Sequence, residues 1–151
     1  MSSNHIEELV NRYLGVSFSV TKKAEALITA QIGTDLTHDQ HYILRYINRV
    51  SSCTSTELVE VFEVNKSAIT AIITRLWEKG LIQRTRDEND RRIVYLSLSD
   101  KGKEFFDQTE ERIHDLVTQF ITQFDPLEIE QFIETYEKLN KILIDIKNKR
   151  L

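Results

Sequence analysis

The feature that most constrains the fold is a pair of short predicted helices between residues 54 and 80, followed at once by a predicted β-hairpin. Thr54 precedes the first helical stretch, with Glu57 three residues further on, and Asn65 precedes the second. Thr and Asn side chains at such positions accept hydrogen bonds from free backbone N–H groups, so each helix has its own start. Gly80 is a suitable left-handed stop for the second helix. Two separately capped short helices joined by a tight turn predict a helix-turn-helix.

The hairpin is predicted in the segment "LIQRTRDENDRRIVYLSL". The polar turn "DEND" separates two strands, and Val94, Leu96 and Leu98 occupy alternate positions of the second strand. A hairpin that directly follows a helix-turn-helix is the arrangement of a winged helix. We therefore predict a winged helix-turn-helix over about 36–98.

Longer helices are predicted on both sides of this segment. Apolar residues recur at helical spacing over about 5–31 and about 100–148, and Ser99 and the run 125–128 mark helix starts. In the first helix, Gly15 and residues 16–20 are expected to bend or loosen the middle, and Gly33 to end it. Thr37 and Gln40 form a capping box that starts another helix.

Composition supports a mainly helical single domain. One Pro and four Gly in 151 residues favour long helices over a β-rich fold, which needs many turns. The fold class predicted for residues 1–151 is therefore mainly α with a small β-hairpin: a winged helix-turn-helix flanked by long N- and C-terminal helices.

Positive charge is concentrated in the predicted winged helix, although the chain carries a net charge of −4. From Val64 to Arg92 there are seven Lys and Arg residues and four Asp and Glu residues, a net +3, whereas the remainder carries −7. This asymmetry predicts one surface that faces an anion and a remainder that is repelled from it.

The second short helix has an inward and an outward face. Ile69, Ile72, Ile73 and Leu76 recur at the spacing of a buried stripe. The predicted nucleic-acid contacts of this helix and its cap are Asn65, Lys66, Ser67, Thr70, Ala71, Thr74 and Arg75. Small Ser, Thr and Ala side chains suit thymine methyl groups and close backbone approach more than guanine reading, so we predict an A·T-rich site.

The segment "ELVEVFEVNKSAITAIITRLWEKGLIQRTRDENDRRIVYLSLSDKGKEF" resembles the MarR family of bacterial transcriptional regulators. The most specific pieces are "VNKSAIT…RL…KGLI", the wing "D-x-x-D-R-R" and the restart "LS-x-KG". "LT-x-x-Q" also fits. The resemblance implies a homodimer in which the first and last two helices of each chain interlock. It implies that two winged helices then bind a pseudo-palindromic operator in double-stranded DNA.

The resemblance also assigns roles to particular residues. Lys66, Ser67 and Thr70 match positions where the helix enters the major groove, and Arg75 matches a phosphate contact. Arg92 matches an arginine that enters the minor groove. The wing residues assigned to DNA binding are Arg84, Arg86, Asp90, Arg91 and Arg92. Asp90 is expected to orient the wing tip, and Arg84, Arg86 and Arg91 to contact phosphates or the other subunit.

One residue departs from the family pattern. Glu63 stands in the helix-turn-helix turn, where the family often has glycine. A left-handed conformation there costs a non-glycine residue roughly 1–2 kcal/mol.

Family ligands usually sit between the dimerisation helices and the winged helix. The resemblance therefore implies a pocket for a small-molecule effector, with these candidates: Tyr13, Phe18, Tyr42, Tyr46 and His114. An apolar stripe at helical spacing also fits a simple core, and the sequence leaves both interpretations open. The response is expected to be that of a ligand- or redox-responsive repressor.

Other chemistry finds little support in the sequence. The single cysteine, Cys53, fits a small buried residue in a reducing cytosol, and a redox sensor is the alternative if Arg49 lowers its pKa. His38 and His41 are interpreted as solvated residues at a helix cap rather than metal ligands. No phosphate loop, nucleophile elbow or zinc-hydrolase pair is present, so we predict no enzyme, metal or cofactor.

No apolar run approaches the roughly 20 residues needed to span a bilayer, and the N-terminus lacks the layout of a secretory signal. We expect a cytoplasmic protein that does not bind a membrane. Two alternatives to a sequence-specific regulator stay open. One is a sequence-relaxed architectural DNA-binding dimer, and the other is an adaptor whose basic wing binds an acidic protein.

Overall fold

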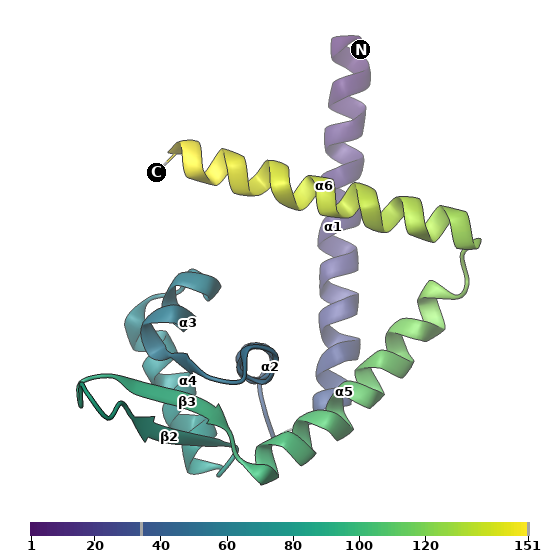
Figure 1. The fold of residues 1–151 in the computed structure, drawn as a ribbon. Coiled ribbons are helices and arrows are strands. Elements are labelled where there is room, and N and C mark those ends of the chain that lie inside the picture. Colours follow the sequence, from purple (N-terminus) through teal and green to yellow (C-terminus); the bar gives the residue numbers. More distant parts are fainter. Residues whose placement is uncertain (34, 151) are drawn as a thin grey trace. The chain divides into compact units, whose positions relative to one another are not determined.

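The computed structural model describes residues 1–33 and 35–150. Its elements in chain order are α1 (Ser3–Ile32), α2 (His38–Val50), β1 (Cys53–Thr54), α3 (Ser55–Phe62), α4 (Lys66–Glu78), β2 (Ile82–Arg86), β3 (Val94–Leu98), α5 (Asp100–Ile121) and α6 (Pro126–Arg150) (Figure 1). The chain divides into two compact units, Met1–Ile113 and His114–Leu151. The predicted fold class, mainly helical with a winged helix-turn-helix, is confirmed.

Helix α1 is continuous from Ser3 to Ile32. Gly15 and residues 16–20, which were expected to bend or loosen the middle, do not break it. None of these residues is proline, so each keeps its backbone donor, and one internal glycine costs only about 1 kcal/mol in a long helix. Gly33, at φ 82°, ends the helix as predicted.

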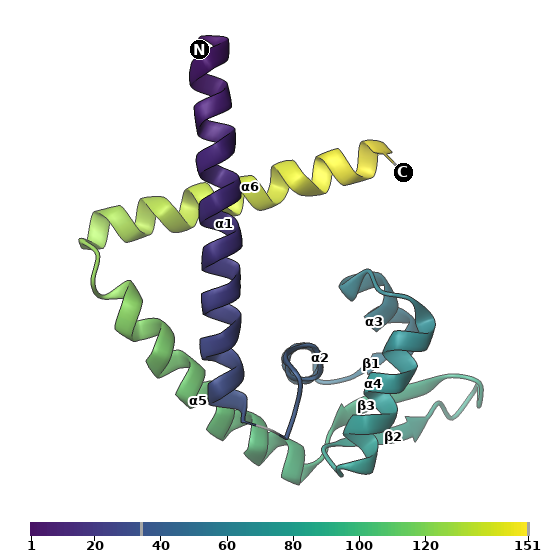
Figure 2. The same cartoon turned by 180° about the vertical axis from the view of Figure 1, so that it is seen from behind.

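The first unit has its core where α2, α3, α4 and the sheet meet. In both views α3 and α4 lie beside each other and next to the strands (Figure 1 and Figure 2). The buried apolar side chains of this core include Ile43, Leu44, Ile47, Leu58, Ile69, Leu76 and Leu96. The predicted capping box at the start of α2 is present, because Thr37 and Gln40 exchange backbone-to-side-chain bonds of 3.2 Å.

The sheet has three antiparallel strands in the order β1-β3-β2, rather than the two strands predicted. The hairpin register pairs Ile82 with Leu98 and Arg86 with Val94. The third strand is only two residues long, and its Cys53 pairs with Leu96. A two-residue strand is too short to show alternation, so the sequence pattern could not reveal it.

A close backbone contact joins the base of the wing to the start of α5. A Cβ atom on Gly102 would lie 1.8 Å from the carbonyl oxygen of Leu81, so only glycine fits without backbone movement. The Ser99 hydroxyl accepts from the Gly102 N–H at 2.9 Å and donates to the carbonyl of Gly80, while Lys101 Nζ donates to the carbonyl of Lys79. These contacts give the "LS-x-KG" segment a structural role at the wing base.

A buried polar group connects α2 to α5. His41 is 1% exposed, stacks on Phe106 and lies with its Nε2 atom 3.6 Å from Glu110, whose other oxygen is 3.3 Å from Arg45. The expectation that His41 is a solvated cap residue was therefore wrong. Its position one turn inside α2 points it at α5, and His38 is itself half-buried against Tyr42.

The second unit leaves much apolar surface exposed. No described residue of α6 is buried. Its large apolar side chains Leu127, Phe132, Tyr136 and Leu143 are each about half exposed or more. Helix α6 begins with Pro126 after Asp125, as the sequence predicted, and the Ile129 N–H bonds to the Asp125 carbonyl at 3.0 Å. Among the residues that the structure describes, no helix is long and apolar enough to cross a bilayer.

Burial lowers the pKa of His41, and the carboxylate of Glu110 opposes this only in part, while Arg45 and His38 add to it. His41 therefore binds a proton more readily in the unfolded chain than in the folded chain. The contribution of His41 destabilises the fold as pH falls below about 6.5 and is absent well above it.

Replacing His41 with Phe should remove this pH-dependent loss. The free energy of unfolding, from urea denaturation at a series of pH values, should fall less for His41→Phe than for the wild type between about pH 7.5 and 5.5. His5→Asn, a change at an exposed histidine, is the control. If the variant and the wild type lose stability in parallel, His41 does not contribute in this way.

Candidate nucleic-acid interface

The helix-turn-helix consists of α3, a turn and α4. The Thr54 hydroxyl accepts from the Glu57 N–H at 3.2 Å, and Asn65 Oδ1 accepts from the Ala68 N–H at 2.7 Å. Both predicted caps are therefore present. Glu63 ends α3 in the left-handed conformation, with φ 53° and ψ 35°, which costs a non-glycine residue roughly 1–2 kcal/mol.

Helix α4 buries one face and exposes the other. Ile69, Ile73 and Leu76 are buried, and Ile72 is half-buried. On the other face Lys66, Ser67, Thr70, Ala71 and Arg75 are exposed, and Thr74 is half-buried. The Thr70 hydroxyl donates to the Lys66 carbonyl at 2.9 Å, so it can only accept a hydrogen bond from another group.

The wing tip is organised by two carboxylates. Asp87 accepts hydrogen bonds from the N–H groups of Asn89 and Asp90 and from the Tyr95 hydroxyl, and these bonds lower its pKa. Asp87 was not among the predicted site residues, although an Asp at the start of a polar turn is a known signal for this geometry.

Asp90 holds Arg92, the wing residue expected to enter a groove. Its carboxylate accepts from the Arg92 N–H, Nε and Nη2 at 3.0, 3.1 and 3.2 Å, and these bonds lower the pKa of Asp90. The Arg92 side chain is nevertheless 90% exposed. The arginine is thus oriented at the tip while it remains accessible to a partner.

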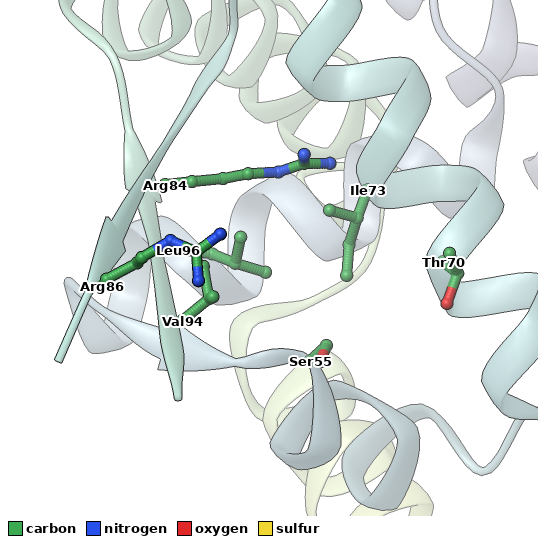
Figure 3. Close-up of a pocket in the computed structure, with 7 residues that line it drawn as sticks. All are labelled: Ser55, Thr70, Ile73, Arg84, Arg86, Val94 and Leu96. Atoms are coloured by element: carbon green, nitrogen blue, oxygen red, sulfur yellow. The ribbon is translucent and has the colours of Figure 1, made fainter. Parts of the chain in front are cut away.

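A hollow of about 320 Å³ lies between α4 and the wing. Figure 3 shows Arg84 and Arg86 reaching from β2 toward it, with Ile73 and Thr70 on α4 and Ser55 at the start of α3. Val94 and Leu96 complete the lining, and none of these seven residues is acidic. Arg86 Nη1 also donates to the Arg91 carbonyl at 3.1 Å. The hollow therefore presents two cations on a partly apolar surface.

The five residues predicted to line an effector pocket do not surround either cavity described in the structure. Tyr13, Phe18, Tyr42 and His114 are exposed and Tyr46 is half-buried, with its hydroxyl donating to Glu57. The second cavity, about 190 Å³, is lined by Ile47, Asn48, Ser51, Ser97, Leu98 and Lys103. Four of these residues belong to the first unit and His114 to the second.

Cys53 is 2% exposed, as its interpretation as a small buried residue predicted. Burial, together with the charge of Glu57, raises the pKa of its thiol to about 11. The alternative, in which Arg49 lowers this pKa, is not supported, because burial and Glu57 raise it and Arg49 lies over the ring of Tyr46. Across residues 1–33 and 35–150, no three His, Cys, Asp or Glu side chains are grouped as a metal site would require.

The winged helix matches a known family over most of its length. The sequence profile of the MarR family covers residues 36–94. The HTH-type transcriptional repressor MdtR of Bacillus subtilis (strain 168) is 32% identical over an alignment of 115 residues that covers 70% of this chain and 74% of that protein. The chain belongs to the MarR family. It is a MarR-family transcriptional regulator, which agrees with the resemblance stated from its motifs.

Other members extend the match beyond the winged helix. An uncharacterized HTH-type transcriptional regulator of B. subtilis, YwhA, is 27% identical over 139 residues, 92% of this chain and 95% of the relative. The crystal structure of a mutant Escherichia coli MarR complexed with operator DNA has a TM-score of 0.75 at 23% identity, covering 86% of this chain and 94% of that one. This MarR-family chain therefore shares its fold with a structure solved on DNA.

The left-handed Glu63 supplies a test of the turn geometry. Replacing Glu63 with Gly should stabilise the protein by about 1 kcal/mol, because glycine adopts this conformation without the steric cost of a Cβ atom. Glu60→Gly, at an exposed position inside α3, should instead destabilise it by about 1 kcal/mol. Urea denaturation of both variants measures the two effects, and a destabilised Glu63→Gly would contradict this expectation.

Proposed function

We propose that this MarR-family regulator binds a pseudo-palindromic site in duplex DNA as a homodimer and represses transcription by occupying a promoter. The observation that carries the proposal is the pairing of an exposed polar face on α4 with a wing whose Arg92 is oriented and 90% exposed. These two elements follow each other in a segment with a net charge of +3, inside a chain of net charge −4. Such a local cationic surface suits phosphate neutralisation.

The proposed contacts divide by the part of DNA that they reach. On α4, Lys66, Ser67, Thr70, Ala71 and Thr74 face the major groove, and Arg75 reaches a phosphate. On the wing, Arg92 enters the minor groove, while Arg84, Arg86 and Arg91 contact the backbone. Asn65 contributes mainly as the cap of α4, since its Oδ1 atom is already bonded to the Ala68 N–H.

The homodimer accounts for the exposed apolar side chains of the long helices. On α1, Tyr13, Leu14 and Phe18 are more than half exposed, and on α6 Leu127, Phe132 and Tyr136 are too. Exposed apolar side chains in such number usually mark a protein interface, and a symmetric pair of identical chains is the simplest partner. MdtR, one relative, is named a repressor, which favours repression over activation.

The protein is proposed to act without a catalytic centre or cofactor. Its response would come from a small-molecule effector near Tyr13, Phe18, Tyr42, Tyr46 and His114. Such an effector changes transcription only if it binds the DNA-competent and the released states with different affinity. The raised pKa of Cys53 keeps this thiol protonated, and a protonated thiol reacts slowly with oxidants. A ligand response is therefore favoured over an oxidant response.

The test is a selection from random duplexes, followed by fluorescence anisotropy at fixed salt. The selected site should be A·T-rich, and the wild type should bind it at least 10³-fold more tightly than unrelated DNA. Lys66→Gln and Arg92→Gln should each weaken binding about tenfold. Lys141→Gln removes an exposed cation on α6 and should change little.

The alternatives give different results in the same experiment. An architectural protein would bind all duplexes with similar affinity. If the protein is an adaptor, Lys66→Gln and Arg92→Gln would leave its affinity for DNA unchanged. Either outcome would contradict the proposed function, and a guanine-rich selected site would contradict the predicted base preference.

A further inference from the structure

Trp77 lies at the last turn of α4, outside the core, with its side chain 50% exposed. The guanidinium carbon of Arg84 lies 4.9 Å from the centre of its ring. We propose that Trp77 is a positioning residue, which holds Arg84 at a seat for a single DNA backbone phosphate in the hollow between α4 and the wing. This inference rests on the proposed DNA-binding function.

The hollow has the chemistry of a phosphate seat. Arg84 and Arg86 are two positions apart on β2, so their side chains leave the same face of the strand. Both line the hollow, together with the Ser55 hydroxyl, and no acidic residue does. Guanidinium groups present paired N–H donors that match the oxygens of a phosphate.

The rest of the lining is mainly apolar and would strengthen this attraction. Ile73 comes from α4, and Val94 and Leu96 are the cross-strand partners of Arg86 and Arg84. Charges interact more strongly beside an apolar surface than in open water. The Thr70 hydroxyl already donates its hydrogen bond to the Lys66 carbonyl, so the donors for a phosphate in the hollow are the two arginines and Ser55.

Both arginines are restrained before any phosphate binds. Arg86 donates to the Arg91 carbonyl at 3.1 Å, and Arg84 lies over the ring of Trp77. A long side chain that is already oriented loses less conformational freedom on binding. Stacking also uses the face of the guanidinium and leaves its N–H groups free for oxygen acceptors, unlike the carboxylate of Asp90, which occupies N–H groups of Arg92.

A double-mutant cycle tests whether Trp77 acts through Arg84. Trp77→Leu, Arg84→Gln and the double variant are compared with the wild type for binding to a duplex selected by the wild type. Arg84→Gln should weaken binding about tenfold and reduce the salt slope by about 1. Trp77→Leu should weaken binding severalfold with an unchanged slope, because the charge still reaches the phosphate. The double variant should bind no more weakly than Arg84→Gln alone, and Trp77→Phe should restore most of the affinity.

Trp77 is the single tryptophan of the chain, so its fluorescence reports the stack directly. Its emission should change in Arg84→Gln without DNA and should remain unchanged in Arg91→Gln. A scan that places neutral methylphosphonates at matching positions of both half-sites should find one position per half-site where Arg84→Gln no longer weakens binding. That position locates the seated phosphate.

The outcomes separate this inference from the proposed function. If the wild type binds no duplex, the proposed function fails. If the wild type binds DNA but the losses of DNA affinity in Trp77→Leu and Arg84→Gln are additive in the double variant, the positioning role alone is overturned. The same holds if Trp77→Leu binds DNA as tightly as the wild type. If no methylphosphonate removes the effect of Arg84→Gln, the phosphate seat is overturned.

Discussion

The close contact between the Leu81 carbonyl and Gly102 is the constraint on which the candidate interface depends. It fixes the point where the chain leaves α4, enters the wing and returns into α5. Ser99 and Lys101 add hydrogen bonds from the start of α5 to the carbonyls that follow α4. Because the base of the wing is tied to the end of α4, the arginines of β2 stay beside the exposed face of that helix. A flexible hairpin would not hold them there.

The polar groups of the interface are restrained by neighbours of different chemistry. Asp87 closes the wing turn, Asp90 orients Arg92, and Trp77 lies under Arg84. An acidic residue therefore has a structural purpose within a cationic arm, since it arranges the arginines without cancelling their exposure. This explains why the wing combines four arginines with three acidic residues between Arg84 and Arg92. Preorganisation of this kind improves binding because fewer side chains must be ordered on contact.

Much of this arrangement could be predicted from the sequence, because it rests on local signals. Thr37, Thr54 and Asn65 cap helices through their own side chains, and Gly33 and Gly80 adopt positive φ at helix ends. The features that were missed depend on contacts between distant residues. The burial of His41 requires Glu110 and Phe106 from α5, and the short strand at Cys53 exists only through its pairing with β3. The hollow beside Arg84 likewise needs α3, α4 and the wing together. Neither spacing nor composition encodes such pairings.

The central claim is that two copies of this winged helix bind neighbouring grooves of one duplex. Hydroxyl-radical footprinting on a selected duplex tests it most directly, with the stoichiometry measured on the same complex by sedimentation. The account predicts two chains per duplex and two protected regions centred about one helical turn, near 10 base pairs, apart. A single protected region bound by one chain would contradict it.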